Sequence, residues 1–486
     1  MKYRVVLSIS LLGVLGIPGI SSGQGFNGRA RTYLSYLELQ ETVLDSVPDS
    51  AVPGEGTERT LRDGTRVSCT DGFCRYFRSG SSLGVAPLIQ DLELNFWTGV
   101  TGLRGYAHVR GRAPLGDEKI WPRSDQEIEA LAAYVEYGRS FYQLKVGRIW
   151  QTTALGFHNF EGGAAQFRLP HQLNVNVYGG TSLLRGLNQW STSDLLTSVE
   201  PLGPRDNAYV LGIRGNWRPL PNVAASFTYQ REESKGSDDL YSERIAGSAR
   251  LLMDGATLDL EVKYDLASEA TNLFRVAVSA PLGGGLRATG ELRKYLPFFD
   301  LWTIWGVFSP VGFREAKGRL DWMDPAGRLG AYAYGSYRDY EDTDVSKPAT
   351  LTLQDESWRL GGGARYALSG DMALNGEYRY DVGYGSSRSG GDLSLRRTFG
   401  PKTYLSVQGT AFESFSEFRI GSGQVVGGGL QGAMPIRNAN LQAGVMYYKH
   451  FQYKRPAAVD FNQTRFHLNL EIPIGKDPGL SGRGNQ

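Results

Sequence analysis

Histidine is where acid–base or nucleophilic chemistry usually shows first, and the chain has five. They are scattered along the sequence: His108, His158, His171, His450 and His467. The metalloprotease pattern HExxH and the haem-attachment pattern CxxCH do not occur in the sequence. We therefore expect no catalytic site, no metal site and no cofactor.

The two cysteines, Cys69 and Cys74, flank an Asp71-Gly72 pair, which is a strong turn signal. The residues on either side of this turn can pair as a small hairpin that brings the two sulfur atoms together. A metal ion would need further cysteine or histidine ligands nearby, and the sequence offers none there. In an exported chain, this spacing predicts a local disulfide.

The polar side chains that could act on a solute recur with a period of two. In LRGYAHVRGRA (residues 103–113), one face of a strand would carry Arg104, His108, Arg110 and Arg112. Three later segments carry both signs of charge in the same spacing: Arg287, Glu291 and Arg293; Glu315, Lys317, Arg319 and Asp321; Glu377, Arg379 and Asp381. Such faces are either a wall that tunes the selectivity of a channel or a ladder of ion pairs that solvates a wet interior.

The first residues have the order of a secretory signal peptide, with Lys2 and Arg4 before an apolar run from Val5 to about Ile20. We expect residues 1–23 to be removed and the mature chain to be exported. The 63 Gly, 26 Tyr, 21 Phe and 9 Trp among 486 residues favour strands, tight turns and interfacial aromatic residues. The formal charge of +2 gives no reason to expect a nucleic-acid partner.

Alternation of apolar and polar residues recurs along the whole mature chain, as in residues 258–265 and 465–472. In a soluble sandwich the apolar faces would meet in a core, whereas in a membrane barrel they would face lipid. The signal peptide, the absence of helical patterns and the aromatic residues at strand ends favour the barrel. The predicted fold is all-β, a transmembrane antiparallel up-and-down barrel in the bacterial outer membrane.

Strands can be laid along residues 24–475 with both termini in the periplasm and the longer loops outside. This gives about 22 strands, within a range of roughly 20–24, and leaves no room for an N-terminal plug domain. The first strand is expected near residues 29–41. A long polar loop that contains the cysteine hairpin follows at residues 42–88, and residues 476–486 form a periplasmic tail.

Residues 295–313, YLPFFDLWTIWGVFSPVGF, form an apolar stretch with the single charge of Asp300. Pro297, Gly306 and Pro310 disfavour a helix. A plain extra strand would make the strand number odd and move every later loop to the other side of the membrane. We therefore predict an apolar loop or tall hairpin at the barrel mouth, with a membrane strand as the alternative. Its aromatic residues are candidates for closing the lumen or contacting a partner: Phe298, Phe299, Trp302, Trp305 and Phe308.

Residues 145–169, KVGRIWQTTALGFHNFEGGAAQFRL, resemble the strand, loop and Phe-acidic-Gly return of several bacterial porin families. The matching positions are Gly147, Arg148, Phe160, Glu161 and Gly162. In those families the intervening loop can approach the pore, so the resemblance implies that Arg148 is a further lumen residue. Elsewhere the chain is similar to outer-membrane barrels only in its general pattern.

A barrel of about 22 strands encloses a lumen that must be filled or gated. The loop 42–88 and the apolar segment near 296–314 are the candidates within the chain, and a protein partner seated in the lumen is a third. That last arrangement resembles the barrels of porin–cytochrome conduits. The leading hypothesis is a porin-like channel for small solutes in the outer-membrane lipid. The alternative is a sheath or scaffold around a periplasmic or lumenal protein, and an outer-membrane enzyme is the least favoured.

Overall fold

The computed structural model describes residues 24–475 except for residues 63, 116–127, 184–207, 235–239, 299–310, 342–354, 384–386, 417–422 and 453–459. The predicted signal peptide and the predicted C-terminal tail lie outside the described residues. The one helical element in the described part is a short 3-10 helix, η1 (Asp49–Ala51). None of the described residues belongs to a helix long and apolar enough to cross a membrane.

The strands form one antiparallel sheet that closes on itself, because β1 (Gln24–Pro48) pairs with β5 (Pro87–Thr98) on one edge and with β25 (Phe461–Gly475) on the other. Of the 25 strands in the sheet, β2, β3 and β4 belong to an extension, which leaves 22 in the wall. The prediction of an all-β antiparallel barrel of 22 strands is confirmed. The absence of a plug domain stays a prediction.

The remaining wall strands follow each other around the barrel in chain order. They are β6 (Leu103–Pro114), β7 (Ile128–Gly138), β8 (Tyr142–Thr153), β9 (Gly156–Leu169), β10 (Leu173–Ser182), β11 (Ala208–Leu220), β12 (Val223–Ser234), β13 (Leu240–Met253), β14 (Ala256–Asp265), β15 (Ala270–Gly283), β16 (Leu286–Tyr295), β17 (Phe313–Met323), β18 (Leu329–Tyr340), β19 (Glu356–Ala367), β20 (Met372–Gly383), β21 (Ser387–Gly400), β22 (Thr403–Ser416), β23 (Gly423–Ile436) and β24 (Ala439–Gln452).

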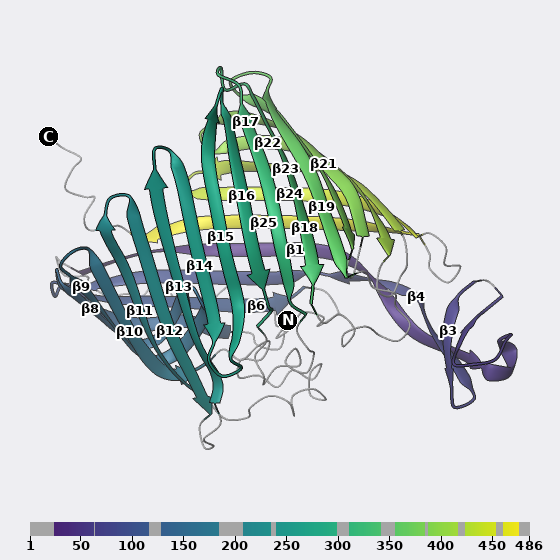
Figure 1. The fold of residues 1–486 in the computed structure, drawn as a ribbon, viewed down its shortest axis with the longest axis horizontal. Helices are drawn as coiled ribbons and strands as arrows, with labels where there is room; N and C mark the ends of the chain where they lie inside the picture. Colours follow the sequence, from purple (N-terminus) through teal and green to yellow (C-terminus); the bar gives the residue numbers. More distant parts are fainter. Residues whose placement is uncertain are drawn as a thin grey trace.

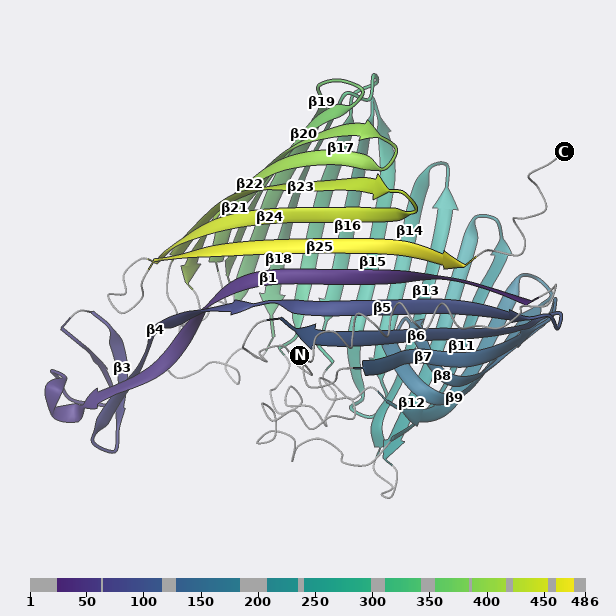
Figure 2. The ribbon, with the colours of Figure 1, turned by 180° about the vertical axis from the view of Figure 1, so that it is seen from behind.

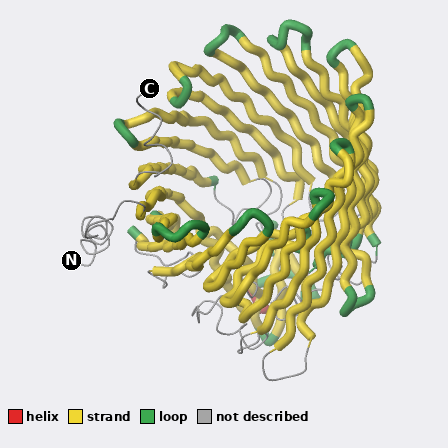
Figure 3. The backbone as a smooth tube through the Cα atoms, turned by 90° about the vertical axis from the view of Figure 1, so that its left-hand side faces the viewer, coloured by secondary structure: helices red, strands yellow, loops and turns green. Residues whose placement is uncertain are grey.

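The two ends of the barrel differ in the length of their connections. At the end where β1 begins and β25 finishes, short turns join the strands, as Figure 3 shows around the rim. One of them, Asp254-Gly255, has positive φ at both residues, the conformation that an Asp-Gly pair favours in a tight hairpin. We call this end the terminal end and the opposite one, which carries the longer connections, the loop end.

The outer surface of the wall is apolar. Large apolar side chains that alternate with polar ones are exposed there, including Val146, Leu211, Leu292, Leu320 and Val445. A soluble sandwich would bury such residues between two sheets, whereas a membrane barrel turns them to lipid. A closed barrel with an even number of strands and an apolar exterior is the architecture of bacterial outer-membrane proteins, and it places the protein in that membrane.

An extension of β1 replaces the long loop predicted at residues 42–88. Residues Leu37–Pro48 of β1 continue past the wall and pair with β4 (Phe73–Val85), which runs through Ala86 into β5. The strands β2 (Glu58–Thr60) and β3 (Arg66–Thr70) and η1 form a head at the tip. We call residues 38–85 the arm. Figures 1 and 2 show the arm projecting clear of the wall, so it does not enter the lumen as an occluding loop would.

The head of the arm has a small core of its own, made of Val52, Val67 and the two cysteines. Cys69 and Cys74 lie opposite each other in β3 and β4 and are joined by the predicted disulfide. Behind the head, the Ser46 N–H and the Arg78 guanidinium donate hydrogen bonds to the Asp45 carboxylate and hold its pKa below the usual range. The arm is therefore an ordered ribbon with its own internal contacts.

Candidate functional site

The polar side chains that alternate with the outward apolar ones turn inward and line the lumen. The predicted basic stripe lies on this face of β6, but neighbouring strands supply an acid for each arginine. Arg104 is 2.5 Å from Glu136, Arg110 is 2.6 Å from Asp91 and Arg112 is 2.7 Å from Glu129. His108 is buried beside the same Asp91, at 3.8 Å. These contacts favour the ion-pair ladder over a free basic wall.

The carboxylates of the later mixed-charge faces are also paired. Glu315 on β17 receives Arg293 from β16 and Arg338 from β18. Arg319 pairs with Asp321 on its own strand, and Arg379 reaches both Glu377 and Asp392. The carboxylates along these strands are therefore neutralised by the wall itself.

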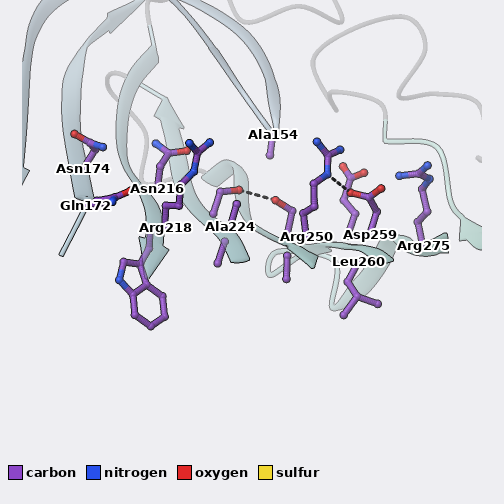
Figure 4. A pocket seen from close by; sticks show the side chains of 16 residues that line it. Ala154, Gln172, Asn174, Asn216, Arg218, Ala224, Arg250, Asp259, Leu260 and Arg275 are labelled. Carbon is purple, nitrogen blue, oxygen red and sulfur yellow. Dashed lines mark hydrogen bonds and ion pairs between the residues drawn. The ribbon is translucent and has the colours of Figure 1, made fainter. Parts of the chain in front are cut away.

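A set of lumen-facing arginines has no acidic partner within 4.0 Å in the described part of the chain. They lie on the lumen face near the terminal end: Arg287, Arg365 and Arg396 by strand register, and Arg218 beside Asn216 in the cavity lining shown in Figure 4. Arg287 donates to the Ser279 hydroxyl, and the Arg396 guanidinium lies over the Tyr404 ring. Sequence reasoning named Arg287 only as part of a mixed-charge face and missed the other three, because the signal is the absence of a cross-strand acid and not the presence of a basic residue.

The hairpin of β8 and β9 leaves the wall and turns into the lumen. Gln230 on β12 lies 3.0 Å from His158 on β9, although strands three places apart in a sheet are separated by roughly 14 Å. Gln151 donates to Asn176 at 2.8 Å, and Arg214 donates to the Thr152 carbonyl at 3.2 Å. The tip of this hairpin therefore lies over the lumen face of β10 to β12. We call residues 148–161 the inward hairpin.

The surface of the inward hairpin that faces the wall packs on it through a small apolar cluster. Ile149 and Phe160 are buried against Tyr178 of β10 and Val210 of β11. The Tyr178 hydroxyl donates to Gln230 at 2.8 Å, so one amide holds both the wall tyrosine and His158 of the hairpin. On the opposite surface, the Trp150 ring meets the lumen-facing His108 of β6 at 6.3 Å between centroids.

Glycines at its base allow the hairpin to bend. Gly147 has φ of +134°, a conformation that side chains disfavour. At Gly162, a Cβ atom would lie 2.1 Å from the Gly179 carbonyl oxygen. Two of the positions that resemble porins, Gly147 and Gly162, are therefore bend positions. The predicted loop between them is a continuous hairpin whose turn is only Ala154-Leu155.

Arg148 and Glu161 close the gap that the hairpin leaves behind. Backbone pairing between β7 and β8 ends at Ala133 and Arg148. Beyond it, the Arg148 guanidinium donates to the Ala130 carbonyl at 2.7 Å and pairs with Glu161 at 2.6 Å. Arg148 thus ties the root of the hairpin to an open strand edge, where an unpaired carbonyl in lipid would be costly. It does not offer a free charge to the lumen.

The apolar stretch 295–313 is a connection at the loop end. Tyr295 of β16 and Phe313 of β17 lie opposite each other in an antiparallel pair, so the two strands that flank the stretch are direct neighbours in the wall. The ring of Phe298 lies 3.7 Å from the guanidinium carbon of Arg244 on β13. The other candidates in this stretch, Phe299, Trp302, Trp305 and Phe308, lie outside the described residues, and their contacts stay predictions.

Among the described residues, the one cluster with metal-ligand spacing is Asp49, Cys69 and Cys74. Both sulfur atoms are consumed by the disulfide, so this cluster does not suit a metal ion.

No protein-family description matches the chain, and no curated protein matches it. Solved structures match in shape. Acinetobacter baumannii OccAB4 is 10% identical, with a TM-score of 0.37 and coverage of 94% of this chain and 100% of its own. The outer membrane protein OpdK of Pseudomonas aeruginosa is 10% identical, with a TM-score of 0.39 over 94% of this chain and 100% of its own. The ferric citrate transporter FecA is 12% identical, with a TM-score of 0.42 over 92% of this chain and 79% of its own. These are likenesses of shape alone. The porin-like barrel follows from the strand pairing of this chain, which closes through β1.

Proposed function

We propose that the protein is an outer-membrane channel for small solutes whose lumen is narrowed by the inward hairpin. The observation that carries the proposal is the hairpin itself, which crosses the lumen face of three strands and is held there by Gln230, Asn176 and Arg214. A barrel of this size leaves an aqueous channel unless something narrows it. A hairpin fixed to one side of the lumen narrows the passage without sealing it.

The unpaired arginines give the channel a preference for anions. Because the lumen carboxylates near Arg287, Arg365 and Arg396 pair with other arginines, these three guanidinium groups form no ion pair of their own among the described residues and can attract a passing anion. They lie near the terminal end, which faces the periplasm in an outer-membrane barrel with long loops outside. The arm then stands on the cell surface.

The alternative of a sheath around a partner protein is less well supported. The inward hairpin takes part of the cross-section that a lumenal partner would fill, and its buried contacts with Tyr178 and Val210 fix it there. The exposed arm remains available for external contacts in either case.

The test is the ion conductance of the purified full-length protein in planar bilayers, with selectivity from the reversal potential in a KCl gradient. We expect discrete channels that favour chloride, and the triple variant Arg287→Gln, Arg365→Gln, Arg396→Gln should bring the preference towards neutrality. The matched control removes three basic residues outside the lumen at the same end: Arg397→Gln, Lys402→Gln, Arg437→Gln. A protein that is folded and never conducts would overturn the proposal.

A further inference from the structure

A cavity of about 680 Å³ lies between the tip of the inward hairpin and the lumen face of β10 to β14. In Figure 4, Ala154 at the tip lies across the cavity from Asn174, Asn216 and Arg250, while Leu260 points the opposite way. The hairpin thus forms a roof over a polar floor. The volume falls within the range of pockets that hold small-molecule ligands.

At one end of the cavity, the polar side chains already pair with other groups of the protein. Arg250 pairs with Asp259 at 2.5 Å, Arg275 pairs with Glu291 at 2.9 Å, and the hydroxyls of Ser226 and Ser248 bond each other at 2.7 Å. A ligand would have to break these contacts before it could use the same groups.

The other end is different, because its polar side chains have no protein partner among the described residues. It consists of the amides of Gln172, Asn174 and Asn216 and the guanidinium of Arg218. Gln172 lies in the turn before β10, Asn174 at the start of β10, and the other two near the end of β11. Asn174 and Asn216 lie directly opposite each other in adjacent strands. Three amides and one cation therefore gather on one wall with their full hydrogen-bonding capacity.

These groups select a particular kind of solute. A guanidinium binds a carboxylate through two parallel hydrogen bonds. A side-chain amide donates and accepts at once, which matches a hydroxyl group that does the same. The aromatic residue in the lining, Trp217, pairs with Ala225 on the outward face, so no ring is offered for stacking a base or an aromatic acid.

We propose that this cavity is a binding site for a sugar acid of monosaccharide size, with its carboxylate on Arg218 and its hydroxyls on the amides of Gln172, Asn174 and Asn216. This inference rests on the proposed channel function and names the class of solute that the channel retains under its hairpin. The tip of the inward hairpin, at Ala154, covers the side opposite the amides.

The first test is isothermal titration calorimetry on the full-length protein in detergent, with D-glucuronate, D-glucose and acetate as probes. We expect saturable binding of glucuronate and much weaker binding of the other two, because glucose lacks the carboxylate and acetate lacks the hydroxyls. Equal binding of acetate and glucuronate would overturn the assignment, since the amides would then contribute nothing. If glucose bound as tightly as glucuronate, the assignment would also be overturned, since Arg218 would then contribute nothing to binding.

Two variants locate the site. Arg218→Gln should weaken glucuronate binding roughly tenfold or more, the usual worth of a charge-assisted contact. Lys402→Gln removes a cation from the exposed turn between β21 and β22, outside the lumen at the same end, and should leave binding unchanged. Ala224→Phe fills the floor without removing a charge and should abolish binding. The heat-dependent mobility shift of a folded barrel on gels shows that each variant is assembled. A loss with Lys402→Gln equal to that with Arg218→Gln would contradict the site.

Conductance separates this inference from the function on which it rests. Channels that conduct and never bind glucuronate would overturn the site and leave the channel standing. Binding by a folded protein that never conducts would support the site and overturn the channel.

Discussion

Two hairpins leave the wall of the same barrel at its loop end, and they go in opposite directions. The arm, built on β1 and β4, projects outward, whereas the hairpin of β8 and β9 turns into the lumen. The arm carries its own core and a disulfide. The inward hairpin finds its core on the wall, through Phe160, Tyr178 and Val210. Each hairpin therefore points towards the core in which its apolar side chains are buried: the arm's own head in one case, the lumen face of the wall in the other.

The backbone at the base of each hairpin differs accordingly. The arm leaves the wall after Leu37, and a register shift follows between Gln40 and Thr42, the kind of irregularity that twists a ribbon away from its sheet. The inward hairpin bends where glycines of three neighbouring strands, Gly147, Gly162 and Gly180, lie side by side. Backbone contacts too close for a Cβ atom hold this bend.

The largest expected effect comes from the glycines at the bend. In Gly162→Ala the new Cβ meets the Gly179 carbonyl oxygen at 2.1 Å, and the backbone must move. We expect the free energy of unfolding to fall by roughly 3 kcal/mol, as in overpacked sites. Urea unfolding in detergent measures it. The control is its neighbour, Gly163→Ala, whose Cβ would lie 3.6 Å from the nearest atom. Equal losses in the two variants would show that the bend does not depend on close packing at Gly162.

A smaller effect is expected from Gln230→Leu. This change leaves the buried Tyr178 hydroxyl and His158 without their shared partner. The expected loss in the free energy of unfolding is roughly 1–2 kcal/mol. The hairpin should also fluctuate, which single-channel recordings would detect as added current noise. Quiet channels in Gln230→Leu would indicate that the apolar cluster alone holds the hairpin.

The smallest effect on the barrel is expected from removing the disulfide. Cys69→Ser with Cys74→Ser should loosen the head of the arm by roughly 2 kcal/mol, a local term that does not reach the wall. Limited proteolysis should cut residues 49–75 faster in the variant, while conductance stays the same. Altered conductance would mean that the arm is coupled to the lumen.

The strands of the wall and their number could be predicted from the sequence, because the contrast between lipid and water acts on every wall strand. Each wall strand has lipid on one face and water on the other, so alternating apolar and polar residues mark the strands. Because both termini were placed on the same side of the membrane, the strand number had to be even, which fits the direct pairing of β16 with β17. The arm faces water on both sides. Its strands, such as FCRYFRSGSSLGV in β4, lose the alternation, and a loop was the natural prediction.

The contacts that make the candidate site could not be predicted in the same way. His158 and Gln230 are 72 residues apart and meet only because the hairpin bends across three strands. Likewise, the charge of Arg104 is neutralised by Glu136, which is 32 residues later in the chain and lies opposite Arg104 in the neighbouring strand. A single sequence does not reveal the register between neighbouring strands, so it cannot tell a paired arginine from an unpaired one.

The central claim is that the inward hairpin narrows the lumen and the arm does not. The most direct measurement compares single-channel conductance of the full-length protein with that of two deletions, each closed by a short glycine turn: residues 150–159 of the inward hairpin and residues 42–82 of the arm. We predict a several-fold rise in conductance for the first deletion and no change for the second. Unchanged conductance without the inward hairpin, in a folded barrel, would contradict the claim.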